Sequence, residues 1–209
     1  MVSTSELTAH FDILGTPIEG LSVVVRKPLA DDRGYLERLY CHKELEGVIP
    51  GGRVAQINRT WTARRGTVRG LHYQCPPHAE IKLVSCLRGE VFDVAVDLRV
   101  DSPTFLRWHA EVLSADNHRA MAIPAGFAHG LQALCDECEM LYLHTAAYEP
   151  TAEAGLHVLD PRLAISWPLP VEGLSPRDAA HAPIGTGFAG VRVAVPDGET
   201  PTESSGRLP

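Results

Sequence analysis

The sequence predicts an all-β protein, and three observations carry this prediction. Helical periodicity is scarce, whereas short apolar segments with a period of two recur along the chain. In residues 90–99, EVFDVAVDLR, large apolar residues alternate with small or acidic ones, as in a strand. Sixteen prolines and eighteen glycines separate these segments. Many short strands divided by turns are typical of a sandwich or barrel of antiparallel sheet.

Further strand candidates follow one another along the chain. They are residues 21–27 (LSVVVRK), 53–60 (RVAQINRT), 82–87 (KLVSCL), 107–114 (RWHAEVLS), 119–124 (RAMAIP), 130–135 (GLQALC) and 140–148 (MLYLHTAAY). Residues 114–121 (SADNHRAM) predict a turn or a short helix between two of them. No repeat or internal boundary is visible, so we expect a single domain over residues 1–185. Residues 186–209 are rich in Pro, Gly, Ser, Thr and acid, which predicts a mobile or loosely docked tail.

Composition excludes several classes of protein. The formal net charge of −7 gives no reason to expect nucleic acid or an acidic membrane as partner. The chain has no apolar run near the length of a membrane span, and its start lacks the order of a secretory signal. Five irregularly spaced cysteines fit a reducing compartment, so we expect a cytoplasmic protein. Cys135 and Cys138 form a CxxC, but the second pair that a structural zinc site needs is missing.

Charged residues interrupt the strand-like stretch 68–84, VRGLHYQCPPHAEIKLV. Arg69, His72 and Lys82 have no place in a purely structural sheet, so they indicate either a metal site or a site for an anionic substrate. Strand alternation puts Arg69 and His72 on opposite faces, and they converge only if the strand bends. His129 follows a Pro-x-Gly turn that fixes its direction, and it is a candidate to share their cavity.

Two further residues do not stand out by spacing. Tyr142 lies in a strand where an aromatic residue is usually part of the core, although its hydroxyl can act as an acid if it faces a cavity. Asp178, in LSPRDAA, has the default interpretation of a surface carboxylate after a loop.

Five longer motifs carry a family resemblance. GTVRGLHYQ, KLVSCLRGEVFDVAVDLRVDSPTF, LSADNHRAMAIPAGFAHG, LDPRLAISWPL and LSPRDAAHAP closely resemble the dTDP-4-dehydrorhamnose 3,5-epimerase family, in order, over residues 18–185. This family consists of cupin-like, dimeric, metal-independent enzymes of deoxysugar biosynthesis. The resemblance implies a double-stranded β-helix, or jelly roll, with a few short helices and a cavity inside the barrel. It implies a homodimer, a dTDP-sugar substrate, no cofactor and no metal.

The resemblance also implies roles for single residues. His72 matches the catalytic base, Asp178 the carboxylate that orients it, Tyr142 the proton donor across the ring, and Lys82 a cation near the sugar carbonyl. Positions that match substrate contacts are Arg33, Gln56, Asn58, Arg69, His129, Tyr148, Glu153, Trp167 and Arg177. Carbons 3 and 5 of the substrate both flank the carbon-4 ketone, so a neutral histidine near pH 7 can remove either proton and leave an enolate. Such an enolate needs a preplaced positive group.

Departures from the family pattern leave alternatives open. Arg38 occupies a position where the family usually has Glu, Ile81 one where Gly is usual, and Leu143 one where Lys is frequent. The enzyme is therefore expected to act at carbon 3, carbon 5 or both. A metal-dependent cupin oxygenase or isomerase using His72, His78 and His129 is one alternative, although Lys82 would repel a cation. A non-catalytic sugar-nucleotide binding protein is another, but it has no use for an acid and base pair.

Overall fold

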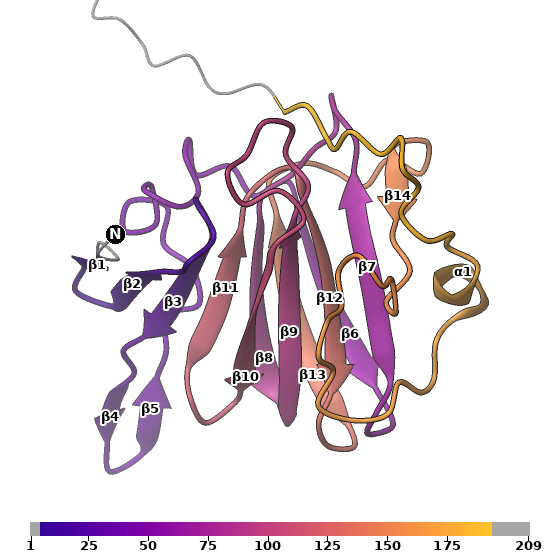
Figure 1. Cartoon of the computed structure of the whole chain (residues 1–209). Coiled ribbons are helices and arrows are strands. Elements are labelled where there is room, and N and C mark those ends of the chain that lie inside the picture. The colour runs from indigo at the N-terminus through magenta and orange to yellow at the C-terminus, as the bar shows by residue number, and fades with distance from the viewer. Residues whose placement is uncertain (1–4, 194–209) are drawn as a thin grey trace, which may run out of the picture.

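The computed structural model describes residues 5–193, and nearly all of its regular structure is antiparallel sheet (Figure 1). The strands are β1 (Ser5–Leu7), β2 (Phe11–Gly15), β3 (Ser22–Arg26), β4 (Leu29–Asp31), β5 (Gly34–Leu36), β6 (Gln56–Thr62), β7 (Val68–Gln74), β8 (Lys82–Arg88), β9 (Glu90–Asp97), β10 (Trp108–Ser114), β11 (Arg119–Ile123), β12 (Phe127–Ala133), β13 (Cys138–His144) and β14 (Glu153–Gly155). In the described part of the chain the single α-helix is α1 (Pro176–Ala179).

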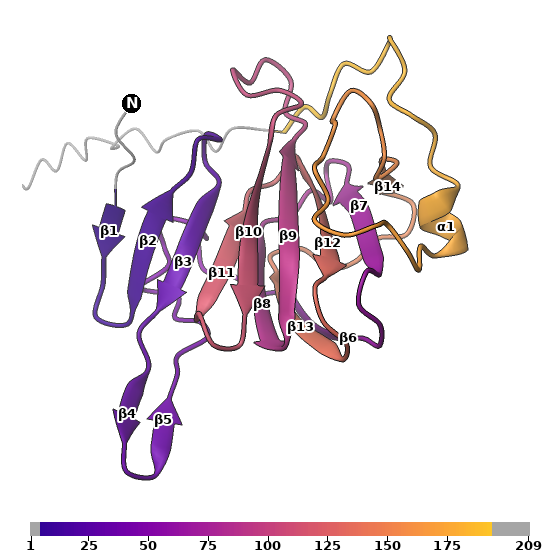
Figure 2. The same cartoon turned by 60° about the horizontal axis from the view of Figure 1, so that its bottom comes forward.

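Two sheets form the body of the molecule. One has seven strands in the order β1-β2-β3-β11-β8-β13-β6, and the other has five in the order β10-β9-β12-β7-β14. The named strands pair antiparallel, and neighbours in a sheet are often distant in sequence, as expected when a chain winds between two facing sheets. This is the predicted jelly roll. The remaining hairpin, β4–β5, projects away from both sheets (Figure 2).

The inner faces of the two sheets meet in an apolar core. Val84, Met121 and Met140 of the larger sheet pack in one cluster with Ala95 and Leu131 of the smaller sheet, all at most 1% exposed. Alternation along each strand then turns the next residue outward, where a second layer covers it. Burial on both faces explains why these strands are more apolar than a half-exposed strand would be.

Irregular segments cover the outer faces. Residues between β14 and α1, including Val158 and Leu163, pack on the outer face of the smaller sheet at Val94 and Val96, and run across it in Figure 1. On the larger sheet, residues from the connection between β5 and β6 pack in the same way against β2, β3, β8, β11 and β13. In the described part of the chain, the outer faces of both sheets are therefore covered.

A bulge in β7 resolves the problem of Arg69 and His72. His72 pairs with His129 and Arg69 pairs with Leu131, so two residues of β7 lie opposite Gly130 alone. The extra residue shifts the alternation by one, which turns Arg69 and His72 toward the same face. Gly70 lies in the bulge at φ +130°, and a Cβ there would sit 2.5 Å from the Cα of Gly130. A glycine is needed here both for the backbone angle and for the close approach of the strands.

The turn before β11 and the C-terminal segment can also be compared with what the sequence predicts. Residues 115–117 form a turn, not a short helix. Of the predicted tail, residues 186–193 carry contacts: Phe188 stacks on Phe105 at 6.2 Å and Val191 pairs with Arg99. The rest, residues 194–209, lies outside the described residues, so the domain boundary stays a prediction. Within the range 5–193, no helix is long and apolar enough to cross a membrane.

Two glycine substitutions test the bulge. Gly34 in the β4–β5 hairpin has the same φ of +130° as Gly70 but open space where a Cβ would lie. Gly34→Ala is expected to cost about 1–3 kcal/mol of unfolding free energy from backbone strain alone. Gly70→Ala adds the clash with Gly130, so its urea midpoint is expected to fall clearly below that of Gly34→Ala. Equal midpoints would contradict the close packing of β7 on β12.

Candidate active site

A cavity of about 930 Å³ opens between the two sheets at the end where polar side chains replace the apolar core. Its size suits a small organic ligand. The lining residues come from both sheets, from the segments beside them and from α1. They are Gln56, Asn58, Thr60, Arg69, His72, Tyr73, Gln74, Glu80, Lys82, His129, Leu131, Tyr142, His144, Tyr148, Glu153, Ser175, Pro176, Arg177 and Asp178.

The change from core to cavity runs along single strands. On β13, Cys138 and Met140 belong to the apolar core, and the next two residues on the same face, Tyr142 and His144, line the cavity. On β6, the lining residues Gln56, Asn58 and Thr60 alternate with residues that face away from the cavity. Because side chains alternate along β13 and β6, one wall of the cavity carries a row of polar groups.

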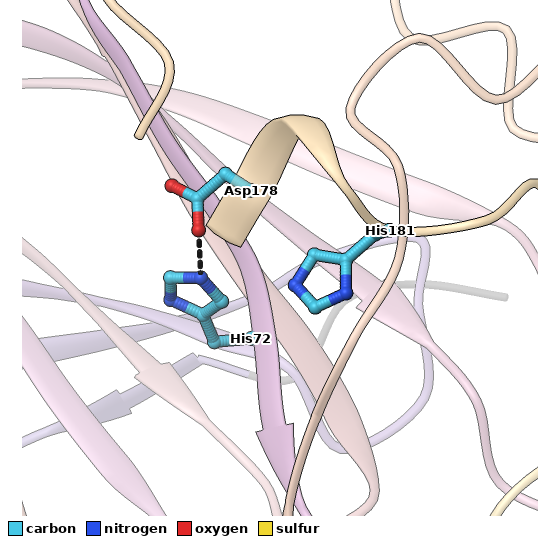
Figure 3. A group of neighbouring side chains, drawn as sticks. All are labelled: His72, Asp178 and His181. Atoms are coloured by element: carbon cyan, nitrogen blue, oxygen red, sulfur yellow. Dashed lines mark hydrogen bonds and ion pairs between the residues drawn. The ribbon is translucent and has the colours of Figure 1, made fainter. Parts of the chain in front are cut away.

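His72 and Asp178 form a hydrogen-bonded pair on the opposite wall (Figure 3). The Nε2 atom of His72 lies 2.7 Å from Oδ1 of Asp178, although 106 residues separate them in sequence. Asp178 is held by the short helix α1, whose N-cap Ser175 accepts a hydrogen bond from the Asp178 amide at 3.0 Å. The carboxylate is 5% exposed, so its direction is fixed by packing as well as by the cap. The sequence reading of Asp178 as a surface carboxylate after a loop is therefore wrong.

Burial sets the protonation state of the His72 imidazole. Removal from water lowers the pKa of His72 below its ordinary value, the Asp178 carboxylate opposes this, and the nearby Arg177 guanidinium adds to the lowering. With Nε2–H donating to Asp178, Nδ1 carries the free lone pair. Among the described residues no hydrogen bond occupies Nδ1. The imidazole is arranged as a neutral base with a fixed tautomer.

Tyr142 faces this pair from the other sheet. Burial raises the pKa of its hydroxyl well above the ordinary value, so the group holds its proton at neutral pH. Its ring contacts the ring of His129 edge-on at 5.9 Å, and its hydroxyl lies 3.5 Å from Oγ1 of Thr60. The cavity therefore has a proton acceptor on one wall and a proton donor on the facing wall.

Cations and their partners surround these two groups. Lys82 donates to the backbone carbonyl oxygen of His72 at 3.4 Å, which places its ammonium against the strand that carries the base. Arg69 is held by Thr62 through a 2.9 Å hydrogen bond. At the rim, Arg177 pairs with Glu153 at 2.7 Å, and the hydroxyl of Tyr148 donates to the same carboxylate at 2.7 Å. These groups offer an anionic ligand three cations within one cavity.

Two of the expected substrate contacts lie elsewhere. Arg33 is on the projecting hairpin, 89% exposed and paired with Asp31 at 2.6 Å. Trp167 packs edge-on against Phe92 on the outside of the smaller sheet, and its indole N–H donates to the Val158 carbonyl. Neither residue lines the cavity of its own chain, because each belongs to a segment outside the two inner faces. All the other expected site residues line it.

The arrangement does not support the metal-dependent alternative. His78 does not line the cavity, and Nε2 of His129 is bound to Asp93 at 2.8 Å. In the range 5–193 the group close enough to share an ion is a different one, His72 with Asp178 and His181. The guanidinium of Arg177 lies 3.4 Å from Nε2 of His72, where it would repel a cation.

Sequence reasoning missed several residues that line the cavity or bind its side chains. His144 lies two positions after Tyr142 on the same strand, so the period of two was a usable signal for it. Glu80 lines the cavity and Asp93 binds His129, and neither gave a signal, because the histidines that they bind lie on other strands. His181 follows α1 and lies beside the His72–Asp178 pair, with ring centroids of the two histidines 6.2 Å apart (Figure 3). Only the folding of the C-terminal segment onto β7 brings it there.

Comparison with known proteins gives consistent matches. Residues 15–185 match the sequence profile of dTDP-4-dehydrorhamnose 3,5-epimerase. The dTDP-4-dehydrorhamnose 3-epimerase of Streptomyces niveus is 41% identical, over 77% of this chain and 78% of that protein. The 3,5-epimerase of Pseudomonas aeruginosa is 48% identical, over 66% of this chain and 76% of that protein. A crystal structure of dTDP-6-deoxy-D-glucose-3,5-epimerase from Legionella pneumophila, in complex with dTDP-4-keto-L-rhamnose, superposes with a TM-score of 0.80 and 41% identity, covering 88% of this chain and all of that one.

The His72–Asp178 pair can be tested by titration. In Asp178→Asn the carboxylate that opposes the effect of burial is gone, so the pKa of His72 is expected to fall further. NMR titration of the His72 imidazole in parent and variant measures the difference directly. A pKa that stays in place or rises in the variant would show that the two groups do not interact as drawn in Figure 3.

Proposed function

The chain belongs to the dTDP-4-dehydrorhamnose 3,5-epimerase family, and from this premise we propose that it epimerises a dTDP-4-keto-6-deoxyhexose next to the ketone. The observation that carries the proposal is the facing pair of groups in one cavity, the neutral His72 held by Asp178 and the protonated Tyr142. Epimerisation needs a base on one side of a carbon and an acid on the other, which is what this pair supplies.

The first step is removal of a proton from the carbon beside the ketone. Nδ1 of His72 accepts the proton, and the electron pair left on carbon delocalises to the carbonyl oxygen as an enolate. Asp178 stabilises the imidazolium that forms and keeps the ring in place. The lowered pKa of His72 means that the base is free at neutral pH and is lost by protonation as the pH falls.

The enolate oxygen then needs positive charge, and the second face needs a proton. Lys82 beside the base is the group proposed to stabilise the oxyanion, because its ammonium is preplaced and shielded from solvent. Tyr142 delivers its proton to carbon from the opposite sheet, which inverts the centre. His72 and Tyr142 afterwards exchange protons with solvent to restore the starting state.

The remaining lining residues are proposed to bind the nucleotide. Arg69 and Arg177 offer guanidinium groups to the diphosphate, for which their planar fork is suited. Gln56 and Asn58 on β6 and His129 on β12 are placed for polar contacts, and Glu153 holds Arg177 and Tyr148 at the rim. Trp167 is left out of this set because it lies outside the cavity.

A monofunctional enzyme is the second candidate. The relative from Streptomyces niveus is named as a 3-epimerase, whereas that from Pseudomonas aeruginosa is named as a 3,5-epimerase, at comparable identity to this chain. One base and one acid serve either outcome, so the number of carbons inverted depends on how the sugar turns in the cavity.

Assembly as a homodimer in the cytoplasm completes the proposal. β6 is one of the two outer strands of the seven-stranded sheet, and its outward residues Ile57 and Trp61 are 62% and 53% exposed. The β4–β5 hairpin likewise exposes Leu36 at 61%. Apolar side chains on an open edge favour coverage by a second copy of the chain. In such a dimer Arg33, at the tip of the hairpin, would reach the cavity of the partner.

Proton NMR with dTDP-4-keto-6-deoxyglucose in deuterium oxide tests the reaction. Exchange of the hydrogens at carbons 3 and 5 is expected with the parent enzyme, and exchange at one carbon alone would assign the monofunctional type. His72→Asn is expected to slow exchange by about 10²–10⁴-fold, the usual contribution of a general base. Absence of exchange above background in the parent would rule out the proposed activity on this substrate.

Mixing two inactive variants tests the dimer and the role of Arg33. Arg33→Ala lacks the group donated to the partner, and His72→Asn lacks the base. A hybrid of the two has one complete site, so random subunit exchange should restore about a quarter of the parent activity. If Arg33→Ala alone is fully active, or if the mixture stays inactive while light scattering shows dimers, Arg33 does not act across the interface.

A further inference from the structure

Glu80 places a buried carboxylate inside a cavity suited to an anionic ligand. Its side chain is 7% exposed and lines the cavity beside Lys82. A bare carboxylate here would repel a diphosphate sugar and would also be costly to remove from water. Two partners compensate it: Oε1 lies 3.3 Å from Nζ of Lys82, and Oε2 lies 3.0 Å from Nδ1 of His144.

The charge on Glu80 is maintained by these partners. Burial alone raises the pKa of the carboxyl, but the hydrogen bond from His144 and the charge of Lys82 more than offset it, so the pKa of Glu80 is below its ordinary value. Glu80 is therefore an anion when the site is ready to bind. Its negative charge is directed at one ammonium and one imidazole.

His144 connects this carboxylate to the acid on β13. Its ring is nearly parallel to the ring of Tyr142, with centroids 6.1 Å apart and planes inclined by 20°. With Nδ1–H donating to Glu80, Nε2 is an acceptor, and it lies 3.5 Å from the side-chain amide nitrogen of Asn58. This tautomer of His144 fits both Glu80 and Asn58. The two contacts hold the imidazole ring against the ring of Tyr142.

Lys82 is held between two acceptors. Its ammonium contacts Glu80 on one side and the His72 carbonyl oxygen on the other. The network therefore runs from the strand of the base, through Lys82, Glu80 and His144, to the ring of Tyr142. It joins the groups proposed to remove the proton, to stabilise the enolate and to return the proton.

We propose that Glu80 and His144 are positioning residues of the epimerase site, where Glu80 holds the Lys82 ammonium at the enolate oxygen and His144 supports the ring of Tyr142. This inference rests on the proposed function. In this proposal neither Glu80 nor His144 touches the reacting atoms. Their effect is on the placement of the cation and the acid, which must be correct in the transition state.

The chain offers a matched control for Glu80. On β10, Glu111 also binds one histidine and one cation, His109 at 2.8 Å and Arg119 at 2.7 Å, and its side chain is 17% exposed. It does not line the cavity. Glu111→Gln therefore disrupts the same kind of ion-pair cluster without touching the site, and it is expected to leave kcat unchanged.

Glu80→Gln is expected to lower kcat by about 10–100-fold with little change in KM. This loss is somewhat smaller than that from removing an oxyanion donor outright, because the donor remains but is misplaced. Glu80→Asp, which keeps the charge, should recover part of it.

A chemical readout separates failure of this inference from failure of the proposed function. Reductive methylation requires a free, uncharged amine, so release of Lys82 from Glu80 should increase the rate of its methylation severalfold in Glu80→Gln and not in Glu111→Gln, as followed by peptide mass spectrometry. An equal rate in both variants would overturn the inference whether or not the parent is an epimerase. If the parent epimerises the sugar but Glu80→Gln keeps full kcat, the inference is wrong and the proposed function stands.

His144 is tested by two substitutions. His144→Phe keeps a ring against Tyr142 but cannot donate to Glu80, whereas His144→Ala removes both contacts. If support of Tyr142 is the role of His144, kcat should fall further in His144→Ala than in His144→Phe. Equal kcat values for the two variants would exclude that role.

Discussion

The close approach of β7 and β12 at Gly70 and Gly130 is the constraint on which the rest of the site depends. Without the extra residue in β7, Arg69 and His72 would face opposite sides of the sheet. With it, both face the interior, and His72 lies in register with His129 on the neighbouring strand. A backbone irregularity at one point thus converts an ordinary strand into a wall of the cavity.

Three imidazoles in the cavity share one kind of contact, a hydrogen bond to a carboxylate. His72, His129 and His144 each have one ring nitrogen bound to a buried carboxylate, at 2.7, 2.8 and 3.0 Å respectively. In each pair the two partners come from different elements. Pairing of this kind fixes the tautomer and direction of each ring, which a site needs if protons are to move between defined atoms.

Charge in the cavity is balanced before a ligand arrives. Lys82 is compensated by Glu80, and Arg177 by Glu153 and Asp178. An anionic sugar nucleotide then meets cations that are already oriented, and much of the cost of ordering them has been met by the fold. Cations gathered in one cavity allow a protein of net charge −7 to hold a site for an anion.

The sequence by itself determined the fold class and most of the groups in the cavity. A period of two in short apolar segments predicts a sandwich or barrel of antiparallel sheet, because it sets which side chains can be buried together, and the family resemblance implies the jelly roll. Long motifs then identified His72, Tyr142, Asp178 and Lys82.

Tertiary structure decided what local spacing cannot. The bulge at Gly70 depends on contact with Gly130, and the partnership of Glu80 with His144 joins residues 64 positions apart. Such contacts arise from how strands pair across the sheets, and alternation along any single strand does not encode them.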